Sequence, residues 1–360
     1  MINVLVTGGA GFIGSNFIRY LLGSQPDLVI YNLDLLTYAG SLENLKNLPN
    51  SDRYNFIEGD ICDRDLVEKV LSENDIDLVV HFAAETHVDR SILGPEAFIR
   101  TNIQGTFVLL ECLRDYWKID SGKIRSDVHF HHISTDEVYG TLSSEAPAFS
   151  EDNQISPNSP YAASKAASDH LVRSYFHTYG LPITITNCSN NYGPNQFPEK
   201  LIPLMILNAI EGKPLPIYGD GQQIRDWLYV EDHCRAIWTV IHTGKPGETY
   251  NVGGENQPTN LEIVQEICKI LDRDIPGSRF VPHNHLIEYV TDRPGHDRRY
   301  AMNINKIKAE VDWKPKVNLK DGLEMTVAWY RENSNWVKKI KDQQEYQSWM
   351  KNNYQNRSVS

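Results

Sequence analysis

Residues 4–14 read Val-Leu-Val-Thr-Gly-Gly-Ala-Gly-Phe-Ile-Gly, and this stretch decides the fold. The apolar run at residues 2–7 predicts a strand, and the apolar residues after the glycines recur at helical spacing. Gly8, Gly11 and Gly14 form a G-x-x-G-x-x-G pattern, one residue looser than the common dinucleotide fingerprint. A glycine turn before a helix presents backbone N–H groups and the positive helix end, which suits a diphosphate. We expect Gly11 to admit the pyrophosphate and Gly14 to let the helix pack on the strand.

The next predicted strand, residues 28–34, ends in a carboxylate, Asp34. Asp34 is placed to accept hydrogen bonds from both hydroxyls of an adenosine ribose. Leu35 and Leu36 follow, and no Lys or Arg stands beside them to receive a 2′-phosphate, so NAD is favoured over NADP. A plain tight turn is the alternative interpretation of the glycines, and this context argues against it.

The composition restricts the class of protein. The chain of 360 residues exceeds one typical domain, and its hydrophobic content of 41% is enough for a large core. A net charge of −12 argues against a general nucleic-acid or membrane-surface binder. Five cysteines without a C-x-x-C pair are typical of a reducing, cytoplasmic compartment. The chain starts in a predicted strand, so we expect no signal peptide, and no apolar run approaches membrane-spanning length.

Predicted strands and helices alternate along the first half of the chain. Further strands are expected at residues 54–59, 78–84, 128–134 and 214–218. Helices are expected at residues 95–116, 161–179, 200–211, 229–243 and 259–271. The alternation predicts a Rossmann-type, doubly wound parallel sheet, with ligands at the carboxyl ends of its strands. We expect an NAD-binding domain at 1–188 with a returning segment near 228–256, and a smaller α/β substrate-binding lobe at 189–360, where 190–198 is a loop.

Two features of the first half have more than one interpretation. Asp60 is either a neighbour of the adenine ring or the N-cap of a helix that starts at Asp63. A metal site is suggested by three nearby histidines, His129, His131 and His132. However, no carboxylate or thiol stands at a spacing typical of a further metal ligand. We therefore interpret these histidines as strand and loop residues and assign no residue to a metal.

The candidate catalytic residues come after the fifth predicted strand, residues 128–134. Ser134-Thr135-Asp136-Glu137 follows that strand, and Tyr161-Ala-Ala-Ser-Lys165 opens a helix. Tyr161 and Lys165 are four residues apart, so they share one helix face. A free phenol is a poor base at its pKa of roughly 10. An ammonium beside it is expected to lower that pKa, so that Tyr161 can take a proton from a substrate hydroxyl while hydride leaves for nicotinamide.

These motifs together resemble those of the extended short-chain dehydrogenases/reductases, and most closely those of their sugar-nucleotide dehydratases. The matching segments are residues 7–14, 34–40, 81–89, 134–140, 161–165, 190–196 and 292–297. The resemblance covers residues 1 to about 340, and the segments at 135–137 and 292–297 are more specific than the glycine and Tyr/Lys motifs.

The resemblance implies a hydro-lyase that acts on dTDP-glucose. NAD would oxidise C4, water would leave across C5 and C6, and hydride would return to C6 to give the 4-keto-6-deoxy sugar. Glu137 would be the base at C5 and Asp136 the acid at the C6 hydroxyl. The residues agree, because two further carboxyls beside a nicotinamide are costly to bury unless they move protons. The alternative is that one of them caps the following turn.

The resemblance also implies a homodimer, paired through the helices near 95–116 and 160–179, and a set of site residues. The catalytic residues are Thr135, Asp136, Glu137, Tyr161 and Lys165. The cofactor-binding residues are Gly8, Gly11, Phe12, Ile13, Asp34, Leu35, Thr37, Gly40, Asp60, Ile61, Phe82, Ala83, Ala84, Thr86, Thr101, Ser134, Tyr161, Lys165, Cys188 and Asn191. The substrate-binding residues are Thr86, Thr135, Asn190, Glu199, Lys200, Leu201, Pro216, Tyr218, Arg225, Asn260, Arg293 and His296. Arg225 and Arg293 are the candidates for the diphosphate, although a single Arg is more often a member of a surface ion pair.

Two other functions share most of these features. An NAD-dependent sugar-nucleotide 4-epimerase would need everything except Asp136 and Glu137. A non-catalytic NAD-binding regulator would not need Tyr161 beside Lys165, since binding alone requires no phenolate. The sequence gives neither the downstream pathway nor a role for the tail from Trp336.

Overall fold

A computed structural model of the chain describes residues 1–292 and 296–351. Its strands are β1 Ile2–Thr7, β2 Leu28–Asp34, β3 Tyr54–Glu58, β4 Leu78–His81, β5 His129–Thr135, β6 Ile183–Cys188, β7 Asn190–Tyr192, β8 Leu215–Tyr218, β9 Trp227–Tyr229, β10 Thr249–Val252 and β11 Ile287–Val290. Its helices are α1 Phe12–Ser24, α2 Arg64–Glu73, α3 Val88–Leu93, α4 Glu96–Phe98, α5 Thr106–Tyr116, α6 Pro160–Tyr179, α7 Leu201–Glu211, α8 Val230–Thr243, α9 Asn260–Asp274, α10 Asn305–Val311, α11 Leu319–Glu332, α12 Ser334–Lys341 and α13 Gln344–Met350. Among the described residues, no helix combines the length and apolarity needed to cross a membrane.

Seven parallel strands form the central sheet, in the order β10-β6-β5-β4-β1-β2-β3. The order reverses at β1, which pairs with β2 on one side and with β4 on the other. The predicted Rossmann-type sheet is confirmed. In such a sheet the ligand crevice lies at this switch point, beyond the carboxyl ends of the strands.

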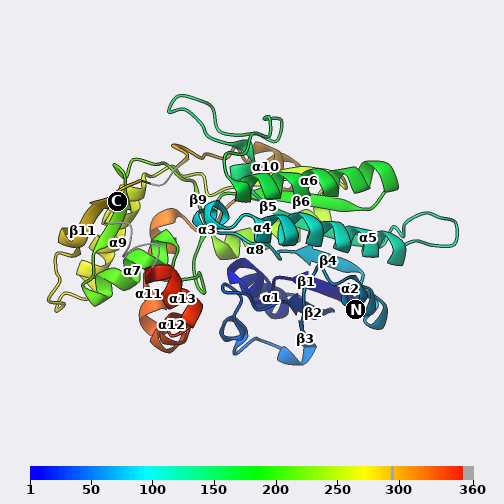
Figure 1. Cartoon of the computed structure of the whole chain (residues 1–360), viewed down its shortest axis with the longest axis horizontal. Helices are drawn as coiled ribbons and strands as arrows, with labels where there is room; N and C mark the ends of the chain where they lie inside the picture. The colour runs from blue at the N-terminus through cyan, green and yellow to red at the C-terminus, as the bar shows by residue number, and fades with distance from the viewer. Residues whose placement is uncertain (293–295, 352–360) are drawn as a thin grey trace.

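Helices cover both faces of the sheet (Figure 1). The core of the sheet consists of two apolar clusters: one joins the sheet to α2, α5 and α6, and the other joins it to α1 and α8. The buried residues of α1, among them Phe17, Ile18, Leu21 and Leu22, follow the helical spacing of its sequence. The returning segment near 228–256 supplies α8 and β10, so it completes both a layer and the sheet edge.

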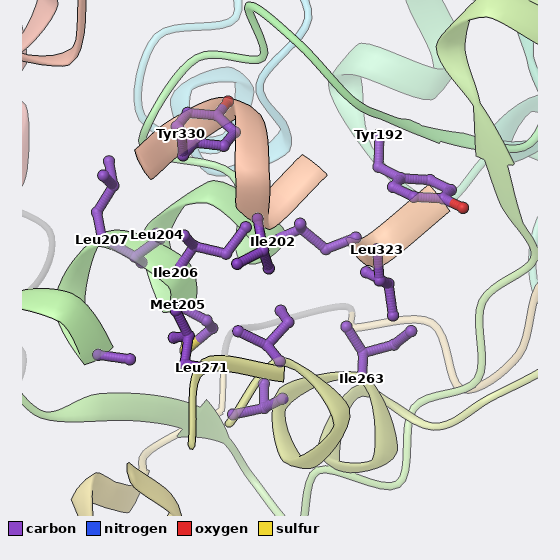
Figure 2. Close-up of a cluster of buried hydrophobic side chains, with 14 of the residues drawn as sticks. Tyr192, Ile202, Leu204, Met205, Ile206, Leu207, Ile263, Leu271, Leu323 and Tyr330 are labelled. Carbon is purple, nitrogen blue, oxygen red and sulfur yellow. The ribbon is translucent and has the colours of Figure 1, made fainter. Parts of the chain in front are cut away.

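A second core lies beside the sheet, on the left in Figure 1. It packs α7 and α9 against α11 and α12, and Figure 2 shows the side chains that meet there, from Tyr192 to Tyr330. β8 pairs in parallel with β11 at its border. The predicted helix at 259–271 is α9, and Thr259 and Glu262 form a complete capping box at its start.

The structure corrects three predicted elements. The strand predicted at 78–84 ends at His81, because the chain then bends over the glycine turn, where a Cβ on Gly8 would lie 2.5 Å from the Ala83 nitrogen. The helix predicted at 95–116 contains a π-helical stretch at Ile99–Gly105. The loop predicted at 190–198 begins with β7, which pairs with β9.

Candidate functional site

The glycine turn between β1 and α1 has the geometry of an anion cradle. Gly8 has φ of +73°, a conformation that side chains rarely adopt. Gly11 is the N-cap of α1 and offers no side chain to the first-turn N–H groups. A Cβ on Gly14 would lie 2.5 Å from the Gly8 carbonyl oxygen, so this close approach of helix and turn requires glycine. The turn therefore has room for a diphosphate, and the uncapped first turn of α1 supplies the N–H donors.

Asp34 lies at the end of β2, next to this turn. Its carboxylate accepts a hydrogen bond from Ala10 N at 2.8 Å and one from Leu36 N at 2.8 Å. Burial raises the pKa of Asp34, and the two backbone donors oppose that rise. Each carboxylate oxygen has two lone pairs, so both can accept a further hydrogen bond from a ribose hydroxyl.

Asp60, at the end of the next strand, is not the N-cap of α2. That position belongs to Asp63, whose side chain accepts a hydrogen bond from Leu66 N. Asp60 instead accepts from Cys62 N at 2.8 Å and forms an ion pair with Arg100 at 2.6 Å. The capping interpretation of Asp60 is therefore wrong, and its carboxylate lies at the wall of the cavity described next.

A cavity of about 300 Å³ connects these groups to the end of β5. Every residue predicted to bind the cofactor and every predicted catalytic residue lines it. The glycine turn, Asp34 and the Tyr161 region thus lie along one continuous space. The residues present fit a dinucleotide, because a diphosphate cradle, a ribose acceptor and a reaction centre line the same cavity.

The reaction centre combines the end of β5 with the start of α6. Ser159 caps α6 by accepting from Ala162 N, and Pro160 starts the helix, so the helix begins just before Tyr161. Thr135 ends β5, and its hydroxyl lies 3.3 Å from Asp136 Oδ1 and accepts from Glu137 N at 3.3 Å. These contacts bring a phenol, a hydroxyl and two carboxyls together.

Burial shifts the protonation of this group. Burial, reinforced by the charge of Glu137, raises the pKa of Asp136 well above its usual range, which favours a neutral carboxylic acid. Asp136 Oδ2 makes no hydrogen bond to any described residue. Burial and the same Glu137 also raise the pKa of Tyr161, while a hydrogen bond with Thr135 opposes the rise.

The net pKa shift of Tyr161 is therefore upward, and the expected lowering effect of Lys165 on the phenol stays a prediction. Lys165 Nζ donates to the Ile133 carbonyl oxygen at 2.7 Å. Burial lowers the pKa of Lys165 itself to about 8, and the carboxylate of Asp169 opposes that fall. The Lys165 ammonium is thus held by the Ile133 carbonyl oxygen and by the charge of Asp169.

Asp169 and His132 form the buried surroundings of Lys165. His132 Nε2 lies 3.4 Å from Lys165 Nζ and 3.2 Å from Asp169 Oδ1. Ser134 Oγ donates to Asp169 Oδ2 at 2.8 Å. Burial raises the pKa of Asp169 to about 6. This network joins β5 to α6 directly behind the reaction centre.

The strand histidines are held by the neighbouring strand β6. His129 and His131 both bond Thr184 Oγ1 at 2.7 Å, and His131 also bonds Thr186 Oγ1 at 3.1 Å. Burial lowers the pKa of both rings, so they remain neutral. The structure therefore assigns these histidines to contacts between strands.

The predicted substrate residues fall into two groups. Thr86, Thr135, Asn190, Glu199 and Lys200 line the cavity. The cavity does not include Leu201, Pro216, Tyr218, Arg225, Asn260 or His296, and Arg293 lies outside the described residues. Leu201 instead packs against the second core at the start of α7.

Most of the remaining residues meet in a separate polar group around β8 and the start of α9. His296 contacts the Tyr218 ring edge-on at 6.3 Å and bonds Asp292 at 2.6 Å, and Gln223 donates to Asp292 at 2.9 Å. The Gln223 carbonyl oxygen accepts from Asn260 N at 2.9 Å. A chain of contacts thus joins Tyr218 to Asn260.

Arg225 and Tyr300 connect this polar group to the reaction centre. The Arg225 guanidinium lies 4.4 Å from the Tyr300 ring centroid and donates to the Asp297 carbonyl oxygen at 2.9 Å. The charge of Arg225 lowers the pKa of Asp136, against the stronger effect of burial. Burial and the charge of Glu137 raise the pKa of Tyr300. The polar group therefore lies within electrostatic reach of the two carboxyls.

Sequence reasoning missed several residues that line the cavity. They are Gly14, Leu33, Tyr38, Ala39, Gly59, Glu85, Ile133, Ser189, Gln196 and Phe197. Most are sequence neighbours of a predicted residue near the carboxyl end of a strand. Extending each predicted site by one or two residues at these strand ends would have found them. Tyr38 and Phe197 come from distant segments, and their rings contact each other edge-on with centroids 5.7 Å apart.

Comparisons with known proteins agree with this geometry. A family model described as GDP-mannose 4,6 dehydratase matches residues 5–326. The dTDP-glucose 4,6-dehydratase of Shigella flexneri is 54% identical over 362 residues, which cover 98% of this chain and 99% of that protein.

Two crystal structures of enzymes with the same description are similar over nearly the whole chain. The Bacillus anthracis structure, in complex with NAD, is 47% identical with a TM-score of 0.84 and covers 95% of this chain and 100% of its own. The Streptomyces venezuelae structure, with NAD and TYD bound, is 44% identical with a TM-score of 0.86 and covers 94% of this chain and 100% of its own.

Proposed function

The chain belongs to the GDP-mannose 4,6 dehydratase family, and from that premise we propose that it is an NAD-dependent hydro-lyase. It removes water from dTDP-glucose and yields dTDP-4-keto-6-deoxyglucose. The observation that carries this proposal is the position of Asp136 and Glu137, which line the same cavity as Tyr161 and Lys165. Oxidation alone needs no further carboxyls, whereas removal of water needs both an acid and a base.

The cavity supports NAD as the cofactor. The first turn of α1, which follows the glycine turn, offers uncapped N–H groups to the diphosphate, and Asp34 offers its carboxylate to the ribose. When bound, NAD accepts hydride from C4 of the sugar and later returns it to C6. No cation is paired with Asp34 among the described residues, which supports NAD over NADP.

Tyr161 takes the proton of the C4 hydroxyl. Its raised pKa does not favour a standing phenolate, so the proton moves in step with oxidation at C4. Thr135, hydrogen-bonded to the phenol, orients that oxygen. Lys165 supplies positive charge on the same helix face, four residues further along.

Asp136 and Glu137 divide the elimination between them. The raised pKa of Asp136 keeps it protonated, so it can donate to the departing C6 hydroxyl. Glu137 is its charged partner and removes the proton at C5, which the C4 ketone makes acidic. A protonated carboxyl beside a second carboxyl is the expected arrangement for such an acid and base.

The substrate is held by both groups of predicted residues. Asn190, Glu199 and Lys200 line the cavity and are assigned to the sugar and its phosphates. Tyr218, Asn260 and their neighbours surround the start of α9, outside the cavity, and are assigned to the nucleotide. The position of Arg225 between the two supports its assignment to the diphosphate.

Mass analysis of the product from dTDP-glucose tests the function. Loss of one water per molecule is the expected result. An unchanged mass with an inverted C4 centre would make the protein an epimerase, and NAD binding without any turnover would make it a regulator.

We propose a homodimer that forms through α5 and α6. Exposed apolar side chains support this surface: Ile99 is 51% exposed, Phe107 is 42% exposed on α5, and Tyr179 is 46% exposed at the end of α6. Phe107→Glu should produce monomers in light scattering, whereas Met325→Glu, at an exposed position of α11, should not. We place the protein in the cytoplasm, where the five cysteines, all free, remain thiols.

A further inference from the structure

The loop after Asp34 borders the cavity and is tied to the glycine turn. Residues 35–45, here called the nucleotide loop, supply several lining residues. Asn44 Nδ2 donates to the Ala10 carbonyl oxygen at 2.8 Å, and Ser41 N donates to the same oxygen at 3.0 Å. Ala10 N in turn donates to Asp34. The end of the loop therefore sets the position of the turn and of the carboxylate beside it.

α12, from the far end of the chain, completes this series of hydrogen bonds. Trp336 Nε1 donates to Asn44 Oδ1 at 2.8 Å, and the two side chains are 8% and 2% exposed. Lys339 adds an ion pair with Glu43 at 3.0 Å. The Asn44 amide thus joins Trp336 to Ala10 with its two ends, and any rotation of the amide would break both bonds.

α13 reaches the same loop at a second point. The Arg90 guanidinium lies between two rings, 3.6 Å from the Tyr38 centroid and 4.4 Å from the Trp349 centroid. Arg90 also forms an ion pair with Glu199 at 3.1 Å. A cation held on two aromatic faces and by a carboxylate has little freedom. Trp349 therefore holds Arg90 against Tyr38, which lines the cavity.

Trp336 is itself fixed by the second core. Its ring contacts Trp329 at 5.0 Å and Tyr330 at 6.1 Å. Trp336 and Tyr330 belong to the cluster around α7 and α9, and Trp329 packs against it. The contacts at Asn44 and Tyr38 thus transmit the position of the second core to the nucleotide loop. In Figure 1, α12 and α13 accordingly lie between α7 and the part of the chain around α1.

We propose that residues 334–350, the C-terminal clasp, position the nucleotide loop and thereby slow the release of NAD. The inference rests on the proposed function, in which the cofactor ends each cycle in the form in which it began. Such a reaction needs no exchange of cofactor between cycles. Slow release of NAD therefore does not lower the turnover rate. Trp336 acts on the loop through Asn44, and Trp349 acts on it through Arg90. These residues do not line the cavity, so they act as positioning residues.

The rate of NAD release tests the clasp. Trp336→Phe keeps an aromatic ring but removes the N–H donor. Trp313→Phe is the matched control, because Trp313 is also buried, lies in another cluster, and its Nε1 makes no hydrogen bond to a described residue. Purified full-length holoproteins are mixed with excess unlabelled NAD, and loss of labelled NAD is followed in time. We expect release from Trp336→Phe to be about fivefold faster than from wild type, the effect of one buried hydrogen bond, and release from Trp313→Phe to match wild type.

Two further readouts separate positioning from general destabilisation. Hydrogen exchange should quicken in residues 35–45 of Trp336→Phe and not in Trp313→Phe, at equal melting temperatures. The double variant Trp336→Phe/Asn44→Ala should release NAD no faster than Asn44→Ala alone. Both substitutions break the same series of hydrogen bonds, so their effects should not add. Trp349→Ala, which breaks the second contact without touching the first, should also speed release.

The outcomes distinguish the clasp from the function beneath it. Wild type that retains NAD, with release equally slow in Trp336→Phe and Trp349→Ala, would overturn the clasp and leave the proposed function intact. Wild-type protein that binds no NAD would overturn the proposed function and the clasp together.

Discussion

The two ends of the cavity are built in different ways. At the catalytic end, buried ionisable groups from β5 and α6 shift one another's pKa values, as Asp136 and Tyr161 show. At the nucleotide end, Asp34 and the glycine turn are held by backbone hydrogen bonds and by helices from the end of the chain. Chemistry is thus concentrated in a few groups, whereas binding is spread over many contacts. Single substitutions should accordingly cost much at the first end and little at the second.

Tyr161→Phe should have the largest effect. It keeps the ring and removes the oxygen that takes the C4 proton, so turnover should fall by about 10² or more while substrate still binds. Steady-state rates and substrate titration measure this, with Tyr179→Phe at the exposed end of α6 as control. A near-normal rate would mean that the base lies elsewhere.

Asp136→Asn and Glu137→Gln should come next, with losses of about 10- to 100-fold. Their groups act after oxidation at C4, so elimination should slow more than oxidation, and NADH absorbance should accumulate in rapid mixing. Equal slowing of both steps, without NADH, would show that the roles are not separate.

Asp136→Asn should raise the thermal stability of the protein, although it lowers the activity. The folded-state pKa of Asp136 is raised, so wild type loses stability as pH rises from the ordinary carboxyl pKa toward the folded one. The amide carries no such cost. Its melting temperature should therefore exceed that of wild type by an amount that grows above about pH 4.

Asp169→Asn should have a smaller, pH-dependent effect. Asp169 raises the pKa of Lys165, which stands at about 8, so its removal should lower that pKa further. The loss of activity at alkaline pH should then begin at a lower pH in the variant, which a comparison of the two pH–rate profiles measures. An unmoved alkaline limb, with activity reduced equally at every pH, would assign Asp169 a purely structural role.

Asp34→Asn, at the nucleotide end, should have the smallest effect. Loss of the charge should weaken NAD binding by about fivefold to tenfold and narrow the preference for NAD over NADP. Titration with both dinucleotides measures this. Equal affinity of wild type for NAD and NADP would contradict the assignment of Asp34 to the ribose.

Local sequence signals were sufficient to predict most strands of the sheet and the site residues that follow them. The strand at 28–34 has the predicted bounds, because an apolar run ending in a polar residue marks both its burial and its end. Asp34 and Thr135 were identified for the same reason, since parallel strands bring their carboxyl ends to one edge.

Contacts between distant segments could not be predicted. Trp336 and Asn44 are 292 positions apart, and neither residue type at its position indicates the other. The partner of Lys165 was missed because the Ile133 carbonyl oxygen becomes available only when β5 and α6 pack. The direction of the Tyr161 pKa shift depends on burial by several elements, which a spacing of four residues does not contain.

Transfer of deuterium within the sugar tests the central claim most directly, namely that one site oxidises C4, removes water and reduces C6. dTDP-glucose carrying deuterium at C4 and a second, heavier label is mixed with unlabelled substrate, and the product is analysed by mass spectrometry and NMR. The account predicts a product lighter by one water, with deuterium at C6 of the doubly labelled molecules and little crossover. Deuterium retained at C4 in a product that has lost water would contradict it.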